Sequence, residues 1–188
     1  MQSLISDAYR AQQTELHAEG KYGYASIHYA PLVNQIVKNL EVNHLLDYGC
    51  GGNLNLYKNL NVDKKLTYQA YDPAIPDYAG EPVPAQMVAC IDVLEHIEPE
   101  FLEAVLDDLC RLTEVVLFCT IHTGPAKKSL PDGRNAHLTQ QPMSWWLPKL
   151  WSRFDLQSVQ VTGEHNFYVI GYVNRRIELL NGGKAGAR

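Results

Sequence analysis

The sequence of 188 residues lacks any apolar run of about 18 residues, the length that a helix needs to cross a membrane. Its first residues, Met-Gln-Ser-Leu-Ile-Ser-Asp, lack a basic region followed by an apolar stretch, so we expect no secretory signal. Positive charge is also scarce, because 16 Lys and Arg stand against 21 Asp and Glu and give a formal net charge of −5. This balance disfavours strong non-specific binding to nucleic acids, which are polyanions.

Cysteine is scarce, and its spacing is not that of a metal site. The cysteines at positions 50, 90, 110 and 119 form no Cys-x-x-Cys pair, which disfavours structural zinc. Three of them lie in or at the end of apolar runs, so we predict free, buried thiols and a reducing, cytoplasmic location. The apolar fraction of 46% and the charged fraction of 20% are typical of a globular protein, and the length suits one domain.

Strand-like and helical patterns alternate along most of the chain. The predicted helices lie near residues 3–19, 31–40, 54–60, 101–110 and 145–151. The predicted strands are 44–48, 66–71, 86–91 and 114–119, followed by two adjoining β-like runs at 156–162 and 166–173. This order predicts an α/β fold with a Rossmann-like, mainly parallel sheet flanked by helices and an antiparallel C-terminal hairpin at one edge.

Three regions are expected along the chain. Residues 1–30 are predicted to form an N-terminal helix and a lid, since Gly20 to Tyr29 is rich in Gly and Tyr and has no clear period. Pro31 suits the first turn of the next helix, so the main domain is expected at 31–175. Residues 176–188 are expected to be a flexible tail.

A glycine-rich turn follows the first predicted strand and precedes a predicted helix. It reads Leu45-Leu-Asp-Tyr-Gly-Cys-Gly-Gly-Asn53, and glycines at such a turn let the backbone come close to a ligand. Asp72 ends the next predicted strand. In nucleotide-binding α/β folds, an acidic residue at this place accepts hydrogen bonds from ribose hydroxyls. A turn with no ligand is the alternative, and the position of Asp72 favours a cofactor.

Three motifs in this order resemble class I S-adenosylmethionine-dependent methyltransferases. They are the glycine turn, Tyr71-Asp-Pro73 and the run Cys90-Ile-Asp-Val-Leu-Glu-His-Ile97. The resemblance covers roughly residues 30–120. A dinucleotide dehydrogenase is the competing interpretation, but Leu54 stands where Gly-x-Gly-x-x-Gly requires its last glycine. The resemblance implies S-adenosylmethionine as the cofactor and methyl transfer as the activity.

The resemblance also assigns cofactor contacts to individual residues. It implies that Asp47 and the backbone of the glycine turn hold the methionine part, that Asp72 holds the ribose, and that Asp92 faces the sulfur. Asn53 replaces the family's third glycine and tolerates a left-handed backbone. The expected cofactor-binding residues are Asp47, Gly49, Cys50, Gly51, Asn53, Asp72, Pro73, Ile75, Asp92 and Val93.

Methyl transfer from a sulfonium depends on positioning and on the exclusion of water, and some acceptors also need a base. Histidine suits that role because its ordinary pKa is about 6.5. His96 and His122 follow predicted strands, whose carboxyl ends form the crevice of a parallel sheet, and His137 lies in the long loop after the fourth strand. We expect these three to be catalytic, with a structural role as the alternative for each. The expected acceptor-binding residues are Arg134, as an anion-binding group, and Tyr24 and His28 from the lid.

The run Asp92-Val-Leu-Glu-His96 permits a second interpretation. It is similar to the metal-binding part of small-RNA 3′-end methyltransferases and of ubiquinone-pathway O-methyltransferases, where acids and histidines surround a divalent ion. His137 would then supply a later ligand. The same run also occurs in methyltransferases without a metal, where it shapes the pocket. Whether this chain holds a metal stays open at this point.

The residues after the third predicted strand also bear on the acceptor. DNA methylases that act on adenine or cytosine nitrogen carry Asn-Pro-Pro-Tyr or Asp-Pro-Pro-Tyr there, and those that act on cytosine carbon carry Pro-Cys. This chain has Asp92-Val-Leu-Glu95 instead. We therefore expect methyl transfer to an oxygen or nitrogen of a small-molecule acceptor. The alternatives are an RNA or modified-nucleotide methyltransferase, with or without a divalent metal, and a non-catalytic cofactor-binding partner subunit.

Overall fold

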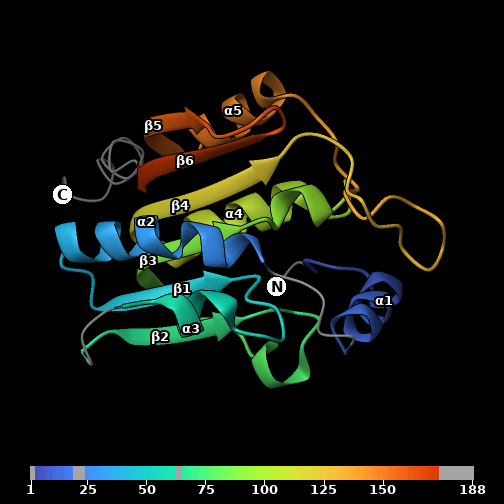
Figure 1. Ribbon diagram of the computed structural model, residues 1–188, viewed down its shortest axis with the longest axis horizontal. Coiled ribbons are helices and arrows are strands. Elements are labelled where there is room, and N and C mark those ends of the chain that lie inside the picture. Colours follow the sequence, from blue (N-terminus) through green and yellow to red (C-terminus); the bar gives the residue numbers. More distant parts are fainter. Residues whose placement is uncertain (1–2, 19–23, 62–64, 174–188) are drawn as a thin grey trace, which may run out of the picture.

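A six-stranded β-sheet lies at the centre of the computed structural model, which describes residues 3–18, 24–61 and 65–173 (Figure 1). The strands are β1 His44–Tyr48, β2 Thr67–Tyr71, β3 Ala85–Ile91, β4 Thr113–His122, β5 Phe154–Val161 and β6 Asn166–Val173. The α-helices are α1 Asp7–Ala18, α2 Ala25–Asn39, α3 Asn55–Asn59, α4 Leu102–Leu112 and α5 Met143–Trp151. The short 3-10 helices η1 Pro76–Tyr78 and η2 Leu94–His96 follow β2 and β3.

The strand order in the sheet is β2-β1-β3-β4-β6-β5. The first four strands of this order are parallel, whereas β6 runs antiparallel to both β4 and β5. The expected mainly parallel sheet with an antiparallel C-terminal hairpin at one edge is therefore confirmed. Among the described residues, no helix combines the length and the apolar character that a membrane span requires.

Each face of the sheet has its own apolar core, because successive side chains of a strand point to opposite faces. On one face, Leu46 of β1 belongs to a cluster with α4 and α5 that includes the fully buried Trp146. On the other face, Leu45 belongs to a cluster with α2 and α3 that includes Val33 and Leu56. Helices thus cover both faces (Figure 1), and this packing fixes the carboxyl ends of the parallel strands.

The four cysteines are free thiols, as the sequence predicts. Cys50, Cys90 and Cys119 are buried, and Cys110 is half-buried. Cys90 of β3 and Cys119 of β4 are paired residues of neighbouring parallel strands. Cys50 lies in the turn after β1, where burial raises the pKa of its thiol well above the ordinary value.

Helix α2 begins at Ala25, whereas the sequence indicates a start near Pro31. Pro31 lies inside the helix, where it cannot donate the usual backbone hydrogen bond. Burial of Ala30 and Val33 against the sheet holds the helix together across this defect. The prediction that residues 25–29 are irregular is therefore wrong, and α2 crosses the domain boundary expected at residue 30. Residues 20–23 of the predicted lid and the predicted tail at 176–188 lie outside the described residues.

Candidate functional site

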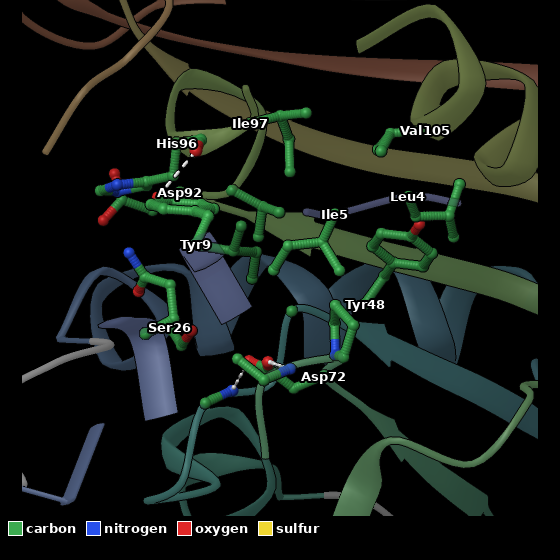
Figure 2. Close-up of a pocket in the computed structure, with 17 residues that line it drawn as sticks. Leu4, Ile5, Tyr9, Ser26, Tyr48, Asp72, Asp92, His96, Ile97 and Val105 are labelled. Carbon is green, nitrogen blue, oxygen red and sulfur yellow. Dashed lines mark hydrogen bonds between the residues drawn. The ribbon is translucent and has the colours of Figure 1, made fainter. Parts of the chain in front are cut away.

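One pocket opens at the carboxyl ends of β1, β2 and β3, beneath residues of the N-terminal segment (Figure 2). Its empty volume is about 880 Å³, with open solvent at its mouth included. The carboxyl ends of neighbouring parallel strands form the usual ligand crevice of an open α/β sheet. The lining residues are Leu4, Ile5, Tyr9, Gln13, Ser26, Tyr48, Gly49, Gly51, Asp72, Pro73, Ala74, Ile91, Asp92, Val93, His96, Ile97 and Val105.

The glycine turn after β1 lines the pocket next to Val93. Gly49 and Gly51 have φ angles of 80° and 61°, which favour glycine. A Cβ atom on Gly49 would lie 2.4 Å from a methyl carbon of Val93, so the turn packs directly on the residue that follows Asp92. The left-handed residue further along the turn is Leu54, with φ 48°, and not Asn53 as the sequence indicates. Close packing of Gly49 on Val93 thus restricts the residue type at this position of the turn.

Asp72 lies at the end of β2 and presents its carboxylate at the pocket. Its side chain is 7% exposed. Oδ2 accepts a hydrogen bond from the Gly51 N–H at 3.1 Å, and Oδ1 accepts one from the Ala74 N–H at 3.0 Å. Each carboxylate oxygen can accept more than one hydrogen bond, so the fixed carboxylate keeps acceptor capacity for ligand hydroxyls.

Asp47 lies behind the glycine turn and is not among the residues that line the pocket. It is 2% exposed, and the Tyr68 hydroxyl donates a hydrogen bond to its Oδ2. Burial raises the pKa of Asp47 from 3.8 to about 7; the hydrogen bond from Tyr68 opposes this rise, and the charge of Asp72 adds to it. Asp47 therefore supports the glycine turn from behind and does not line the pocket itself.

The expected cofactor residues thus fall into two groups. Those that line the pocket are Gly49, Gly51, Asp72, Pro73, Asp92 and Val93. Those that do not line it are Asp47, Cys50, Asn53 and Ile75.

Asp92 follows β3 with a φ of 60°, an unusual backbone conformation for a residue other than glycine. Its N–H donates a hydrogen bond to Oγ1 of Thr120, on the neighbouring strand β4, at 2.9 Å. Its carboxylate reaches the part of the pocket where His96 lies (Figure 2). Residues held in such conformations are concentrated at functional sites.

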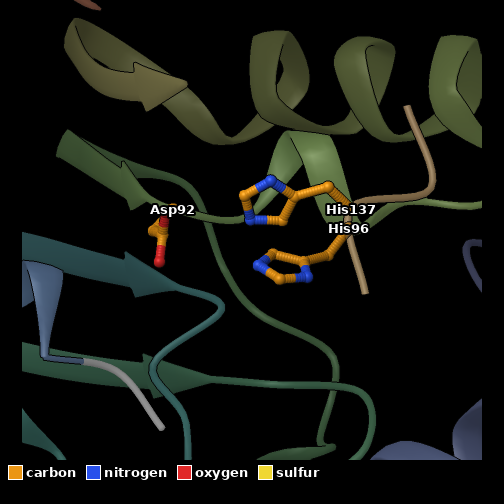
Figure 3. Close-up of side chains that lie close together, drawn as sticks. All are labelled: Asp92, His96 and His137. Atoms are coloured by element: carbon orange, nitrogen blue, oxygen red, sulfur yellow. The ribbon is translucent and has the colours of Figure 1, made fainter. Parts of the chain in front are cut away.

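His96 and His137 lie together next to Asp92 (Figure 3). Their ring centroids are 4.8 Å apart, and one ligand atom from each of the three side chains lies within 4.8 Å of the others. Nδ1 of His96 is 2.8 Å from the Ala136 carbonyl oxygen, and Nδ1 of His137 is 2.7 Å from the Gly124 carbonyl oxygen. A carbonyl oxygen only accepts, so Nδ1 carries the proton in both rings. Each neutral ring therefore keeps a lone pair on Nε2.

Glu95 is fully buried between this cluster and β4. Its Oε1 accepts a hydrogen bond from the His122 N–H at 2.7 Å. Burial, the nearby charge of Asp92 and a side-chain hydrogen bond with Asp92 raise the pKa of Glu95 well above its usual value. The protonated form of Glu95 can donate that hydrogen bond to the Asp92 carboxylate.

The cluster of Asp92, His96 and His137 fits a divalent cation. Imidazole nitrogens and a carboxylate oxygen are ligands that Mn²⁺, Fe²⁺, Co²⁺ and Zn²⁺ accept in proteins. The carbonyls bound to Nδ1 are the outer partners that usually orient metal-binding histidines.

His122 lies behind His137 and does not line the pocket. The ring centroids of the two residues are 4.7 Å apart. Burial, with a smaller contribution from His137, lowers the pKa of His122. Of the three histidines expected to be catalytic, only His96 lines the pocket; His137 contacts the ring of His96, and His122 contacts the ring of His137.

The residues expected to bind the acceptor do not line the pocket either. Arg134 forms a salt bridge with Asp132 at 2.7 Å, and its guanidinium lies 5.9 Å from the centre of the Tyr9 ring. Tyr24 is 65% exposed, and His28 makes an edge contact with the next ring along α2. Their contact with an acceptor stays a prediction.

Several lining residues were not identified from the sequence. Leu4, Ile5, Tyr9 and Gln13 come from the N-terminal segment, and Ser26 comes from the predicted lid segment. The stripe formed by the first three predicts a helix but carries no sign of a ligand.

Comparison with known proteins gives matches among solved structures. No protein-family model matches the sequence, and comparison with curated proteins finds no match. A Burkholderia thailandensis 1,6-didemethyltoxoflavin-N1-methyltransferase, crystallised with 1,6-didemethyltoxoflavin and S-adenosylhomocysteine, is similar at TM-score 0.66 and 12% identity, covering 88% of this chain and 87% of its own. The methyltransferase domain of bacterial CtHen1-C is similar at TM-score 0.57 and 15% identity, covering 79% of this chain and 98% of its own. Magnesium protoporphyrin IX methyltransferase from Synechocystis PCC 6803, with bound S-adenosylhomocysteine, is similar at TM-score 0.54 and 14% identity, covering 80% and 84%.

The sheet order, the crossover helices and the turn after β1 define a Rossmann-like α/β protein. More narrowly, the chain has the class I methyltransferase fold. At identities of 12%, 14% and 15%, this likeness establishes the fold, and the activity has to be argued from the site.

Proposed function

We propose that this chain is an S-adenosylmethionine-dependent methyltransferase that acts on an oxygen or nitrogen of a small-molecule acceptor. One observation carries the proposal: a single pocket brings together the glycine turn, the fixed carboxylate of Asp72 and the carboxylate of Asp92 at the ends of three adjacent parallel strands. The bound S-adenosylhomocysteine in two of the similar structures supports the choice of cofactor.

The two ends of the pocket differ in chemistry, and this difference orients the cofactor. Leu4, Ile5 and Val105 make one end apolar, and Asp92 and His96 make the other end polar (Figure 2). Adenine suits the apolar end and the sulfonium suits the end that carries the negative charge of Asp92. Asp72 lies between them, where it would accept hydrogen bonds from the ribose hydroxyls.

His96 is the residue that we assign as the base. The cofactor supplies a methyl group on a positively charged sulfur. When bound, it would pass this methyl group to the attacking oxygen or nitrogen of the acceptor as the carbon–sulfur bond breaks, and S-adenosylhomocysteine would be the leaving group. Nε2 of His96 takes the proton that the acceptor loses, because its Nδ1 proton is held by the Ala136 carbonyl. The carboxylate of Asp92 stabilises the resulting imidazolium.

The lining of the pocket supports a small acceptor without a phosphate group. Among the described residues, neither Lys nor Arg lines the pocket. The guanidinium of Arg134 is paired with Asp132. The similar methyltransferases that bind didemethyltoxoflavin and act on magnesium protoporphyrin IX also take small molecules.

Calorimetry with S-adenosylhomocysteine tests the proposal. The parent protein should bind it, and Asp72→Ala should weaken binding by roughly ten- to a hundredfold, because it removes a buried charged acceptor. Asp155→Ala is a matched control, since Asp155 is exposed on β5. Equal affinities for parent and Asp72→Ala would contradict the assignment. Binding without turnover on any acceptor pool would instead favour a non-catalytic partner subunit.

A second candidate is metal-assisted methyl transfer, including transfer to an RNA or modified-nucleotide acceptor. The arrangement of Asp92, His96 and His137 favours it, because a bound cation would draw acceptor oxygens to the polar end of the pocket. Loss of transfer in EDTA, restored by Mn²⁺, would favour this candidate. Full transfer in EDTA would favour His96 acting as the base without a metal.

A further inference from the structure

Helix α1 and the residues just before it line part of the pocket. Leu4 and Ile5, just before the helix, line the pocket together with Tyr9 and Gln13 of the helix itself. Ile5 is 8% exposed and Tyr9 is 3% exposed, so this segment is packed against the domain.

On the cofactor side, α1 is joined to the residues around Asp72. The hydroxyl of Thr14 donates to the Ala74 carbonyl oxygen at 2.7 Å and shares its single proton with the Arg10 carbonyl oxygen of α1, which lies 2.9 Å away. The N–H of Ala74 in turn donates to Oδ1 of Asp72 at 3.0 Å. Two hydrogen bonds therefore connect the helix to the carboxylate that we assign to the ribose.

On the acceptor side, α1 is joined to the histidine cluster and to its loop. The hydroxyl of Tyr9 donates to the His96 carbonyl oxygen at 2.9 Å. Ile5 and Tyr9 form a small buried cluster with Leu130 and Ala136, which directly precedes His137. The apolar core of this loop is thus completed by the N-terminal segment.

The beginning of α1 is held in place between these two sides. The N–H and the hydroxyl of Ser6 donate to the Glu98 carboxylate at 2.9 and 2.7 Å. The Ser6 oxygen also accepts the Tyr9 N–H at 3.1 Å, which caps the helix. A helix fixed at its start and bonded on both flanks is a contiguous physical connection between them, which is what coupling of the two flanks requires.

We propose that Thr14 and Tyr9 are positioning residues, through which α1 couples binding of the adenosine group at Asp72 to the order of the loop that carries His137. This inference rests on the proposed function. Among the described residues, none of the loop at 123–142 lines the pocket, so a ligand acts on this loop through its neighbours. An ordered loop holds the ring of His137 against the ring of His96. Binding of the adenosine group at Asp72 would thus order the residues next to the acceptor.

Hydrogen exchange on the full chain, with and without saturating S-adenosylhomocysteine, tests this coupling. In the parent protein, the ligand should slow exchange across residues 126–138 by about fivefold or more, as is typical of coupled sites. At S-adenosylhomocysteine concentrations that saturate each variant, as measured by calorimetry, Thr14→Val and Tyr9→Phe should lose most of this slowing. Thr14→Ser, which keeps the hydroxyl, and Glu15→Gln, a change at an exposed position of α1, should behave as the parent.

The outcomes separate the two proposals. If calorimetry detects no binding of S-adenosylhomocysteine to the parent, the proposed function fails and this inference fails with it. If the ligand binds but the loop is not slowed in the parent, or is slowed equally in Thr14→Val and Tyr9→Phe, this inference alone is overturned. The substitutions change neither His96 nor Ala136, whose hydrogen bond also joins the pocket to the loop, so lost slowing is assigned to α1.

Discussion

The buried carboxyl group of Asp47 makes the stability of the fold depend on pH, and one substitution tests this. Burial raises its pKa from 3.8 to about 7. Asp47→Asn removes the ionisable group and keeps an oxygen that accepts the hydrogen bond of the Tyr68 hydroxyl. The variant should therefore be more stable than the parent at alkaline pH and nearly equal to it in acid.

The direction of this pH dependence follows from the pKa of Asp47 in the unfolded chain, 3.8, and in the folded chain, about 7. Below pH 3.8 the carboxyl is protonated in the folded and unfolded chain, and its ionisation contributes nothing. Between pH 3.8 and about 7 the unfolded chain loses this proton while the folded chain keeps it, so the free energy of unfolding falls as pH rises. Above about pH 7 the free energy of unfolding falls no further on account of Asp47. The whole fall is about 4 kcal/mol, because each unit of difference between the two pKa values contributes about 1.4 kcal/mol.

Urea unfolding at pH 4.5 and pH 8 measures this effect. The difference in the free energy of unfolding between Asp47→Asn and the parent should grow by about 3 kcal/mol from the lower to the higher pH. Glu95, whose pKa is also raised by burial, is present in both proteins, so its contribution cancels. Asp155→Asn serves as the exposed control. A difference that is the same at both pH values would refute the reasoning.

Three further predictions concern the turn, the cluster and the core. Gly49→Ala should lower the free energy of unfolding by about 1–3 kcal/mol because its Cβ meets Val93, and adding Val93→Ala should restore part of the loss in urea unfolding; equal losses would argue against this contact. His137→Ala should weaken Mn²⁺ binding at least about tenfold by electron paramagnetic resonance, whereas unchanged affinity would exclude the cluster as a metal site. Trp146→Ala should cost about 3–5 kcal/mol in thermal or urea unfolding, since the side chain is fully buried; a cost near zero would contradict its place in the core.

The fold could be predicted from the sequence because its signals are local. The alternation of strand and helix patterns and the turn that contains Gly49 need only neighbouring residues to be recognised, and Asp72 follows from its place after the next strand. The start of α2 was missed because Pro31 is a strong signal for a first turn, while the apolar contacts that extend the helix back to Ala25 come from the sheet.

The other half of the pocket could not be predicted, because it depends on contacts between distant residues. Ile5 meets Leu130 and Ala136 in one buried cluster, and no periodicity in the sequence relates these positions. The meeting of His96 and His137 was expected only as what the resemblance to metal-binding methyltransferases implies, because it depends on the path of a long loop, where His137 bonds the Gly124 carbonyl. Residue types identified the candidates, and only tertiary packing decides which of them meet.

The distribution of the thiols gives the protein intrinsic reporters for chemical labelling. Cys90 and Cys119 lie on paired strands in the middle of the sheet, so a thiol reagent reaches them when the sheet itself comes apart. Cys50 lies in the glycine turn, where a local opening is enough to expose it. Labelling rates at these positions in the natural sequence, measured by mass spectrometry, therefore distinguish local opening of the glycine turn from global unfolding without any engineered cysteine.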